Sequence, residues 1–190
     1  MTDSRGSVYE VIIKNVLLSP QVQSIDFYIG WLHVFGLSYA AVANAISSGK
    51  IGLVYLPLQT TVAARYDFRK KQYQLPDRNF GFTPFDQVTI AHESTHAAVS
   101  MQYSTLPITD TLYEAAGYIA AAIYNRAYGM AAVMPLPQER IADLISQSLP
   151  RGGIVSSADE ASLRQAIANR PNYAQKGITY NSYVYKAGGR

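Results

Sequence analysis

The residues best suited to chemistry lie in the middle of the chain, where two of its three histidines are four positions apart. His92 and His96 flank Glu93-Ser94-Thr95, so the stretch has the pattern H-E-x-x-H. On a helix, residues four apart share one face, with β-carbons about 5–6 Å apart, so both imidazoles can bind one metal ion. Glu93 then stands beside the pair, within reach of a water molecule at the ion. The pattern predicts a metal site if the stretch is helical.

The residues around the motif favour a helix. Thr83 can cap it, Pro84 suits the first helical position, and Asp86 suits the positive end of the helix dipole. From there to Tyr103 no glycine or proline interrupts the segment. We therefore expect a helix over 84–103 with both histidines inside it. The alternative is an amphipathic helix that carries two surface histidines without a ligand role.

A catalytic metal site of this kind needs a third protein ligand. Zinc in enzymes has three protein ligands and an open position, and the chain has no cysteine, so the ligands must be histidine or carboxylate. The candidates are Glu114, Asp110, His33 and Glu139. Glu114 is favoured because it lies eighteen residues after His96, in a second expected helix at 110–128 that can run antiparallel to the first. Alanines on both facing surfaces favour close packing of the two helices.

Two of these candidates also have purely structural interpretations. Thr111 and Glu114 fit a capping box, in which the Glu114 carboxylate folds back on the start of its own helix. His33 stands beside Trp31 in an apolar run, where a core histidine with satisfied hydrogen bonds is the more ordinary interpretation. We take Glu114 as the third ligand and keep capping as its alternative.

The motif, followed by a glutamate in the next helix, resembles that of the gluzincins, the thermolysin-like zinc peptidases. The resemblance covers residues 84–128 and implies a zincin-like fold, with His92, His96 and Glu114 as zinc ligands and Glu93 as catalytic base. The stretch Ala-His-Glu-Ser-Thr-His-Ala is also similar to small bacterial H-E-x-T-H domains, some of which are attached to secreted toxins or effectors.

The chain departs from the gluzincin pattern at two points. Four residues after Glu114, where the family has an aspartate that orients a histidine, this chain has Tyr118. The orienting partner must then be Asp110, Asn125 or a backbone carbonyl. The chain also lacks the additional histidine that usually donates to the oxyanion. Of the tyrosines at 103, 113, 118 and 124, we choose Tyr118 for that role.

These residues predict a zinc-dependent hydrolase of peptide or other amide bonds, with Glu93 as general base. A strand edge within residues 51–75 would align an extended peptide or protein substrate. One alternative is a metal-binding structural or protein-interaction domain with little or no turnover. Another is a helical interaction module in which the motif is a coincidence.

Composition and local patterning predict the fold class. With 190 residues, 48% of them hydrophobic and 15% charged, the chain is expected to form a single domain over 1–190. Helical spacing dominates, and short strands occur around residues 51–75, so we expect a mostly helical α+β domain with a small antiparallel sheet packed beside the motif helix. A helical part is expected over 135–170, and a tyrosine-rich tail over 171–190 that adds an edge strand.

Charge and hydropathy indicate which binding partners and which cellular compartments to expect. A net charge of +3 does not favour nucleic acid, and the basic residues between 65 and 78 are interpreted as a solvated hairpin turn. The longest uncharged run, 27–43, is short for a membrane span, so a buried helical hairpin is preferred. The N-terminus lacks the pattern of a cleavable signal, which leaves the cytoplasm or export without a leader, as an effector. No oligomeric state is favoured.

Overall fold

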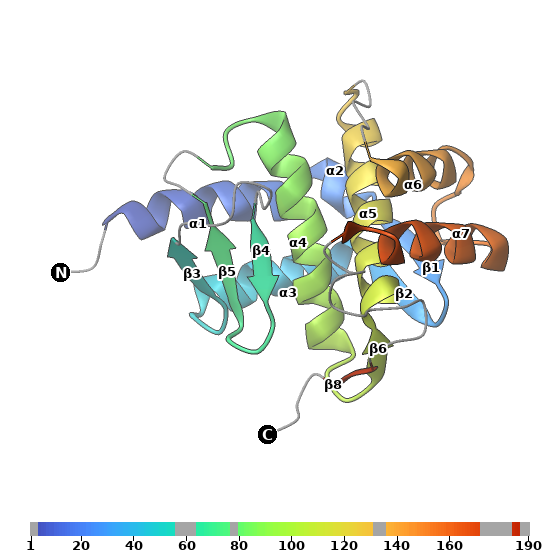
Figure 1. The fold of residues 1–190 in the computed structure, drawn as a ribbon. Coiled ribbons are helices and arrows are strands. Elements are labelled where there is room, and N and C mark those ends of the chain that lie inside the picture. The colour runs from blue at the N-terminus through green and yellow to red at the C-terminus, as the bar shows by residue number, and fades with distance from the viewer. Residues whose placement is uncertain (1–3, 56–63, 77–79, 131–135, 172–183, 187–190) are drawn as a thin grey trace.

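Two helices at the centre of the molecule position the histidine motif (Figure 1). Helix α4 (Pro84–Gln102) carries the motif, and α5 (Asp110–Ala127) packs against it more extensively than any other pair of elements. The sheet that contains β4 lies on the α4 side, and α6 and α7 lie on the α5 side (Figure 1). The computed structural model describes residues 4–55, 64–76, 80–130, 136–171 and 184–186.

The other elements surround this helix pair. The helices are α1 (Ser4–Leu17), α2 (Pro20–Gln23), α3 (Gly36–Ser47), α6 (Pro137–Ser148) and α7 (Ser157–Ala168). The strands are β1 (Asp26–Ile29), β2 (Leu32–Phe35), β3 (Gly52–Tyr55), β4 (Arg65–Asp67), β5 (Gln72–Leu75), β6 (Pro107–Thr109), β7 (Gly153–Ile154) and β8 (Val184–Lys186). The chain is therefore an α+β protein, as predicted. Its buried hydrophobic residues form a core cluster that extends from Ile13 in α1 to Ile167 in α7.

The sheet formed by residues 52–75 is mixed, so the predicted antiparallel sheet is wrong in part. Its strand order is β3-β5-β4; β4 and β5 form an antiparallel hairpin, whereas β3 pairs with β5 in parallel. In the hairpin turn, the Asp67 carboxylate accepts hydrogen bonds from the backbone N–H groups of Arg69 and Lys70 at 3.0 and 3.1 Å. Strand β3 follows α3 and is not joined to β5 by a hairpin, so it can add to the free edge of β5 in the parallel sense.

The segment expected to be a buried helical hairpin begins instead with a β-hairpin, which corrects that prediction. Strands β1 and β2 pair antiparallel from Asp26↔Phe35 to Ile29↔Leu32, and only then does α3 begin. Burial alternates along both strands, a period of two that the sequence already contains. Gly30 has φ +54° in the two-residue turn, a conformation that favours glycine. Strand β7 adds to β1 in parallel and completes a second three-stranded sheet.

The helix ends follow the predicted signals with small shifts. Helix α4 begins as expected, with a capping box in which Thr83 and Asp86 exchange hydrogen bonds of 3.1 Å. Helix α7, within the expected helical part, is capped by Ser156, whose hydroxyl accepts from the Asp159 N–H. In the tail, β8 pairs antiparallel with β6, which confirms the predicted edge strand.

Two buried tyrosines from neighbouring elements form hydrogen bonds to side chains of the motif helix. The Tyr73 hydroxyl, from β5, donates to Ser94 Oγ at 2.7 Å. Tyr39, from α3, lies 2.7 Å from Thr95 Oγ1; because Thr95 itself donates to the Ala91 carbonyl, Tyr39 is the donor. All of these polar atoms are in buried side chains, where hydrogen bonds are worth most. The two bonds fix the rotation of α4 about its own axis, and so the direction in which its histidines point.

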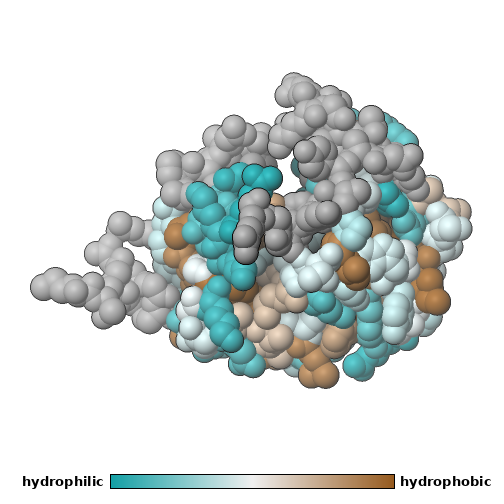
Figure 2. All heavy atoms as spheres, turned by 90° about the horizontal axis from the view of Figure 1, so that it is seen from below, coloured by the Kyte–Doolittle hydropathy of each residue, from teal (hydrophilic) through white to brown (hydrophobic). Residues whose placement is uncertain are grey.

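The surface carries scattered apolar side chains. Figure 2 shows hydrophilic and hydrophobic residues interspersed on the face seen from below. In the part of the chain that the structure describes, no helix combines the length and apolar character needed to cross a bilayer.

Replacing Tyr73 by phenylalanine should destabilise the protein. The substitution removes the donor to Ser94 and leaves a buried hydroxyl without its partner, at a cost of about 1–3 kcal/mol in the free energy of unfolding. Urea denaturation followed by circular dichroism measures this difference. Tyr28→Phe, at an exposed tyrosine, is the matched control, and a Tyr73→Phe variant as stable as that control would contradict the anchoring role.

Candidate metal centre

Three side chains from α4 and α5 converge on one point. The Nε2 atoms of His92 and His96 lie 3.1 Å apart, and the Glu114 carboxylate oxygens lie 3.5 Å from His92 Nε2 and 3.6 Å from His96 Nε2. Among the described residues, these three form the one group of histidine and acidic side chains arranged to hold a metal ion. The structure thus brings the predicted ligands together.

The separations between donor atoms fit a tetrahedral metal ion. Zinc bonds to histidine nitrogen and carboxylate oxygen are about 2.0–2.2 Å long, so two donors on a tetrahedron lie about 3.3–3.6 Å apart. The two imidazole nitrogens are 3.1 Å apart, and the contacts of 3.5 and 3.6 Å to Glu114 are made by its two different carboxylate oxygens, so each of the three side chains can offer a donor atom to a single ion. The His92 and Glu114 side chains are 14% and 21% exposed, so solvent reaches the group. The residues therefore fit a metal ion with three protein ligands.

Two turns of α5 form the wall against which both imidazoles pack. The Tyr113 ring stacks on His96, with ring centroids 4.2 Å apart and planes 18° apart. Tyr118 meets His92 edge to face, with centroids 4.8 Å apart. Between them, Gly117 has no side chain, and a β-carbon there would lie 2.9 Å from His92 Cε1. The missing side chain at Gly117 is what allows the His92 ring to approach α5.

Glu93 is buried beside the triad and bonded to the neighbouring sheet. Its Oε2 accepts a hydrogen bond of 2.6 Å from the backbone N–H of Tyr66 in β4. Burial raises the pKa of Glu93 to about 7; the Glu114 charge acts in the same direction, and His92, the Tyr66 bond and Arg65 oppose it. A carboxyl group with this pKa can both accept and release a proton near neutral pH.

The two histidines differ in electrostatic environment in the metal-free protein. Burial, reinforced by His92, lowers the pKa of His96 to about 3 against the opposing Glu114 charge. For His92, burial lowers the pKa, but the hydrogen bond to Glu114 and the charges of Glu93 and Glu114 outweigh it and the net shift is upward. His96 is therefore a neutral imidazole, the form that binds metals.

At His96, the partner expected to orient a histidine through its other ring nitrogen is not found among the described residues. His96 Nδ1 is buried and has no hydrogen-bond partner, so neither Asp110, Asn125 nor a described backbone carbonyl fills this role. The ring is held instead by its stacking on Tyr113. The Tyr113 hydroxyl donates to the His96 carbonyl at 2.8 Å and lies 2.7 Å from Ser100 Oγ, which fixes the position of the stacked ring.

The structure decides between the ligand candidates. Helix α5 is capped by Thr109, so Glu114 lies too far along the helix for the capping box proposed with Thr111. His33 Nε2 lies 2.9 Å from Asp26 Oδ1, outside the triad, which agrees with a satisfied structural histidine. The Glu139 carboxylate accepts from the Leu136 N–H at the start of α6. Asp110 is the first residue of α5 and is not part of the triad.

Of the four candidate tyrosines, Tyr118 is the one whose ring touches His92. Its hydroxyl accepts a hydrogen bond of 2.6 Å from Arg170 Nη1. Burial raises the pKa of Tyr118, as does the Glu114 charge, while Arg170 and Gln138 act in the opposite direction. The hydroxyls of Tyr103 and Tyr124 bond to the His33 backbone and the Gln87 side chain respectively.

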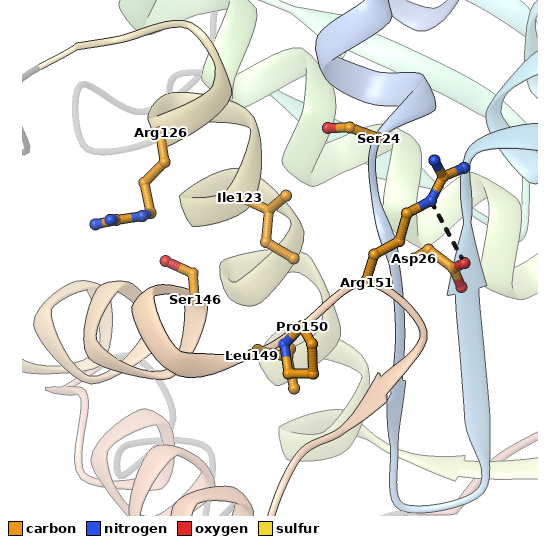
Figure 3. A pocket seen from close by; sticks show the side chains of 8 residues that line it. All are labelled: Ser24, Asp26, Ile123, Arg126, Ser146, Leu149, Pro150 and Arg151. Carbon is orange, nitrogen blue, oxygen red and sulfur yellow. Dashed lines mark ion pairs between the residues drawn. The ribbon is translucent and has the colours of Figure 1, made fainter.

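A surface pocket of about 110 Å³ lies away from the triad. Figure 3 shows its lining, formed by Ser24, Asp26, Ile123, Arg126, Ser146, Leu149, Pro150 and Arg151. Arg151 points toward Asp26, at 3.8 Å, and Arg126 points away from the pocket and pairs with Asp143 at 3.4 Å (Figure 3). Its charged groups therefore do not converge on a ligand.

Sequence reasoning missed several residues that build the site. Gly117 is a lone glycine within an alanine-rich helix, three residues after Glu114, and such a glycine signals close packing. Arg170 and Gln138 belong to no motif, and nothing in the sequence connects them with Tyr118. Their positions follow only from the packing of α6 and α7 against α5.

Gly117→Ala should weaken metal binding while the helix remains intact. The new methyl group would meet His92 Cε1 at 2.9 Å and its two ring nitrogens at 3.0 Å, so the imidazole must move. Alanine is the better helix former by about 1 kcal/mol, so the fold should survive. Zinc titration of the metal-free protein should show affinity lower by about tenfold or more.

Gly52→Ala is the matched control, because its added β-carbon would make an ordinary contact at 3.6 Å with Gln72. Equal zinc affinity in the wild type and the Gly117→Ala variant would show that the missing side chain at Gly117 does not determine the position of His92.

Comparison with known proteins gives no family for this chain. No family model, no curated protein and no solved structure matches it. The assignment of a metal centre therefore rests on the geometry of His92, His96 and Glu114.

Proposed function

We propose that this protein is a zinc-dependent hydrolase of peptide or other amide bonds, of the gluzincin type. The observation that carries the proposal is the position of Glu93. It supplies a buried carboxylate with a pKa near 7 that interacts electrostatically with His92 and Glu114, two of the three side chains that converge on the candidate metal position. A metal site that served only to brace two helices would not require this acid, and burying a carboxylate is costly.

The proposed chemistry divides between the ion and the chain. A zinc ion held by His92, His96 and Glu114 would supply Lewis acidity toward water and toward a carbonyl oxygen. Glu93 takes the proton of the attacking water and passes it to the leaving amine. The Tyr66 N–H holds Glu93 Oε2, so we assign proton transfer to Oε1. Tyr118 is the proposed donor to the oxygen that becomes negative.

The edge of the sheet supports an extended substrate at the site. Strand β4 is an edge strand in the order β3-β5-β4 and contacts α4. Because the Tyr66 N–H bonds to Glu93 and not to β5, the free edge of β4 faces Glu93. Because the Tyr66 N–H is engaged by Glu93, a peptide beside this edge would lie next to the general base without pairing at that N–H. We therefore propose a peptide or protein as substrate.

Glu93→Gln should strongly reduce hydrolysis and leave zinc bound. Glutamine has nearly the same shape and can still accept from the Tyr66 N–H, but it cannot take a proton from water. We expect turnover of an amide substrate to fall about 10²- to 10⁴-fold. Turnover is measured by amine release from a peptide library, and zinc content by elemental analysis of the same preparation.

Glu114→Ala is the companion variant, because it removes a ligand and should lose both zinc and turnover. A Glu93→Gln protein that hydrolyses peptides as fast as the wild type would remove Glu93 from the mechanism. A zinc-loaded wild type that cleaves no member of the library would leave the structural or interaction role as the function of the site.

A further inference from the structure

We infer that Tyr118, Arg170 and Gln138 form an anion-binding cluster beside the metal triad, which receives a negatively charged oxygen of the substrate. The inference deepens the proposed function and rests on it for the identity of the substrate. The three residues come from different parts of the chain: Tyr118 from α5, Gln138 from the first turn of α6, and Arg170 from the segment that follows α7. Each presents hydrogen-bond donors.

The Tyr118–Arg170 pair provides the first part of the cluster. Arg170 Nη1 donates to the Tyr118 hydroxyl at 2.6 Å, and the guanidinium carbon lies 5.9 Å from the centre of the Tyr118 ring. A hydroxyl oxygen that accepts from a cation has its own proton directed to another acceptor, and the adjacent charge makes it a stronger donor. Arg170 is thus placed to orient the Tyr118 hydroxyl.

Gln138 provides the second, independent observation. Its side chain interacts with the Tyr118 hydroxyl and lowers the pKa of that group, and the residue is only 1% exposed. Its Nε2 is buried and makes no hydrogen bond of ordinary length and angle. A buried amide donor without an acceptor costs stability, so a site that keeps one needs an explanation. An acceptor oxygen on a bound molecule would provide it.

The cluster adjoins the triad on the side away from the sheet. The Tyr118 ring packs on His92, and Tyr118 lies one helical turn after Glu114. Glu114 and Glu139 are the acidic neighbours of Tyr118; Glu114 belongs to the triad, and the Glu139 carboxylate is engaged with the Leu136 N–H. Glu93 approaches the triad with its Tyr66 partner from the sheet. A bound carbonyl would therefore have the base on one side and the cluster on the other.

Two substrate oxygens have the chemistry that this cluster would bind. One is the oxygen that becomes negative when water adds to the scissile amide. The other is a carboxylate at the end of a peptide, for which a guanidinium is a common partner. Both are negatively charged oxygens next to the metal position, and the experiment below separates them.

The test measures binding of inorganic phosphate to the zinc-loaded full chain by calorimetry at constant ionic strength. Tyr118→Phe, Arg170→Gln and Gln138→Leu should each raise the phosphate Kd about tenfold or more, since each removes a hydrogen bond to an anion. Gln138→Leu should also keep or raise the Tm, because the buried donor that it removes makes no hydrogen bond of ordinary length and angle in the free protein.

Arg151→Gln is the control for loss of one positive charge; its side chain is 72% exposed and pairs with Asp26 away from the triad. Unchanged phosphate affinity in all three cluster variants, or an equal loss in Arg151→Gln, would overturn the inference. Because the test measures phosphate binding and not turnover, it can still be interpreted if the protein proves not to be a hydrolase.

Two competitors distinguish the sources of the oxygen. An N-acetyl dipeptide with a free carboxylate should displace phosphate from the wild type if the cluster binds a peptide terminus, whereas the corresponding amide should not. Weak, equal competition by both, together with loss of phosphate affinity in the cluster variants, would assign the cluster to the reacting oxygen.

Discussion

The close approach of α5 to the histidine face of α4 is the constraint on which the site depends. An imidazole can lie against α5 only because position 117 has no side chain, and a β-carbon there would fall within 3.0 Å of His92 Nε2. The same packing brings Glu114 to within 3.6 Å of both imidazoles and stacks Tyr113 on His96. Ligand geometry and helix packing are therefore one property of this pair of helices.

The motif helix is fixed on its other sides by partners from three more segments. Glu93 is bonded by β4, Ser94 by β5 and Thr95 by α3. Consecutive residues of a helix point in different directions, so these bonds surround the helix. Little rotation of α4 is possible without breaking one of them. Such preorganisation suits a site in which a water molecule, a base and a metal ion must meet within a few tenths of an ångström.

The sequence alone predicted the parts of the site that depend on local spacing. The capped helix 84–102, its two histidines and the convergence of Glu114 on them follow from motif and helix periodicity, and the α+β class follows from the mixture of patterns. The hairpin of β1 and β2 was not predicted. The uncharged run 27–43 is long and apolar enough to suggest helices, and this outweighed the alternation that appears as alternating burial in the two strands. The parallel pairing of β3, the approach at Gly117 and the meeting of Tyr118, Gln138 and Arg170 depend on tertiary packing, which no local pattern encodes.

The central claim is that one ion is bound by two imidazoles and one carboxylate with a position left open, and X-ray absorption at the zinc edge of the loaded protein tests it most directly. We expect four light-atom neighbours at about 2.0–2.2 Å, two of them with the outer-shell scattering of histidine, and the loss of one histidine signal in His96→Ala. A spectrum of a fully hydrated ion, or one unchanged by His96→Ala, would contradict it.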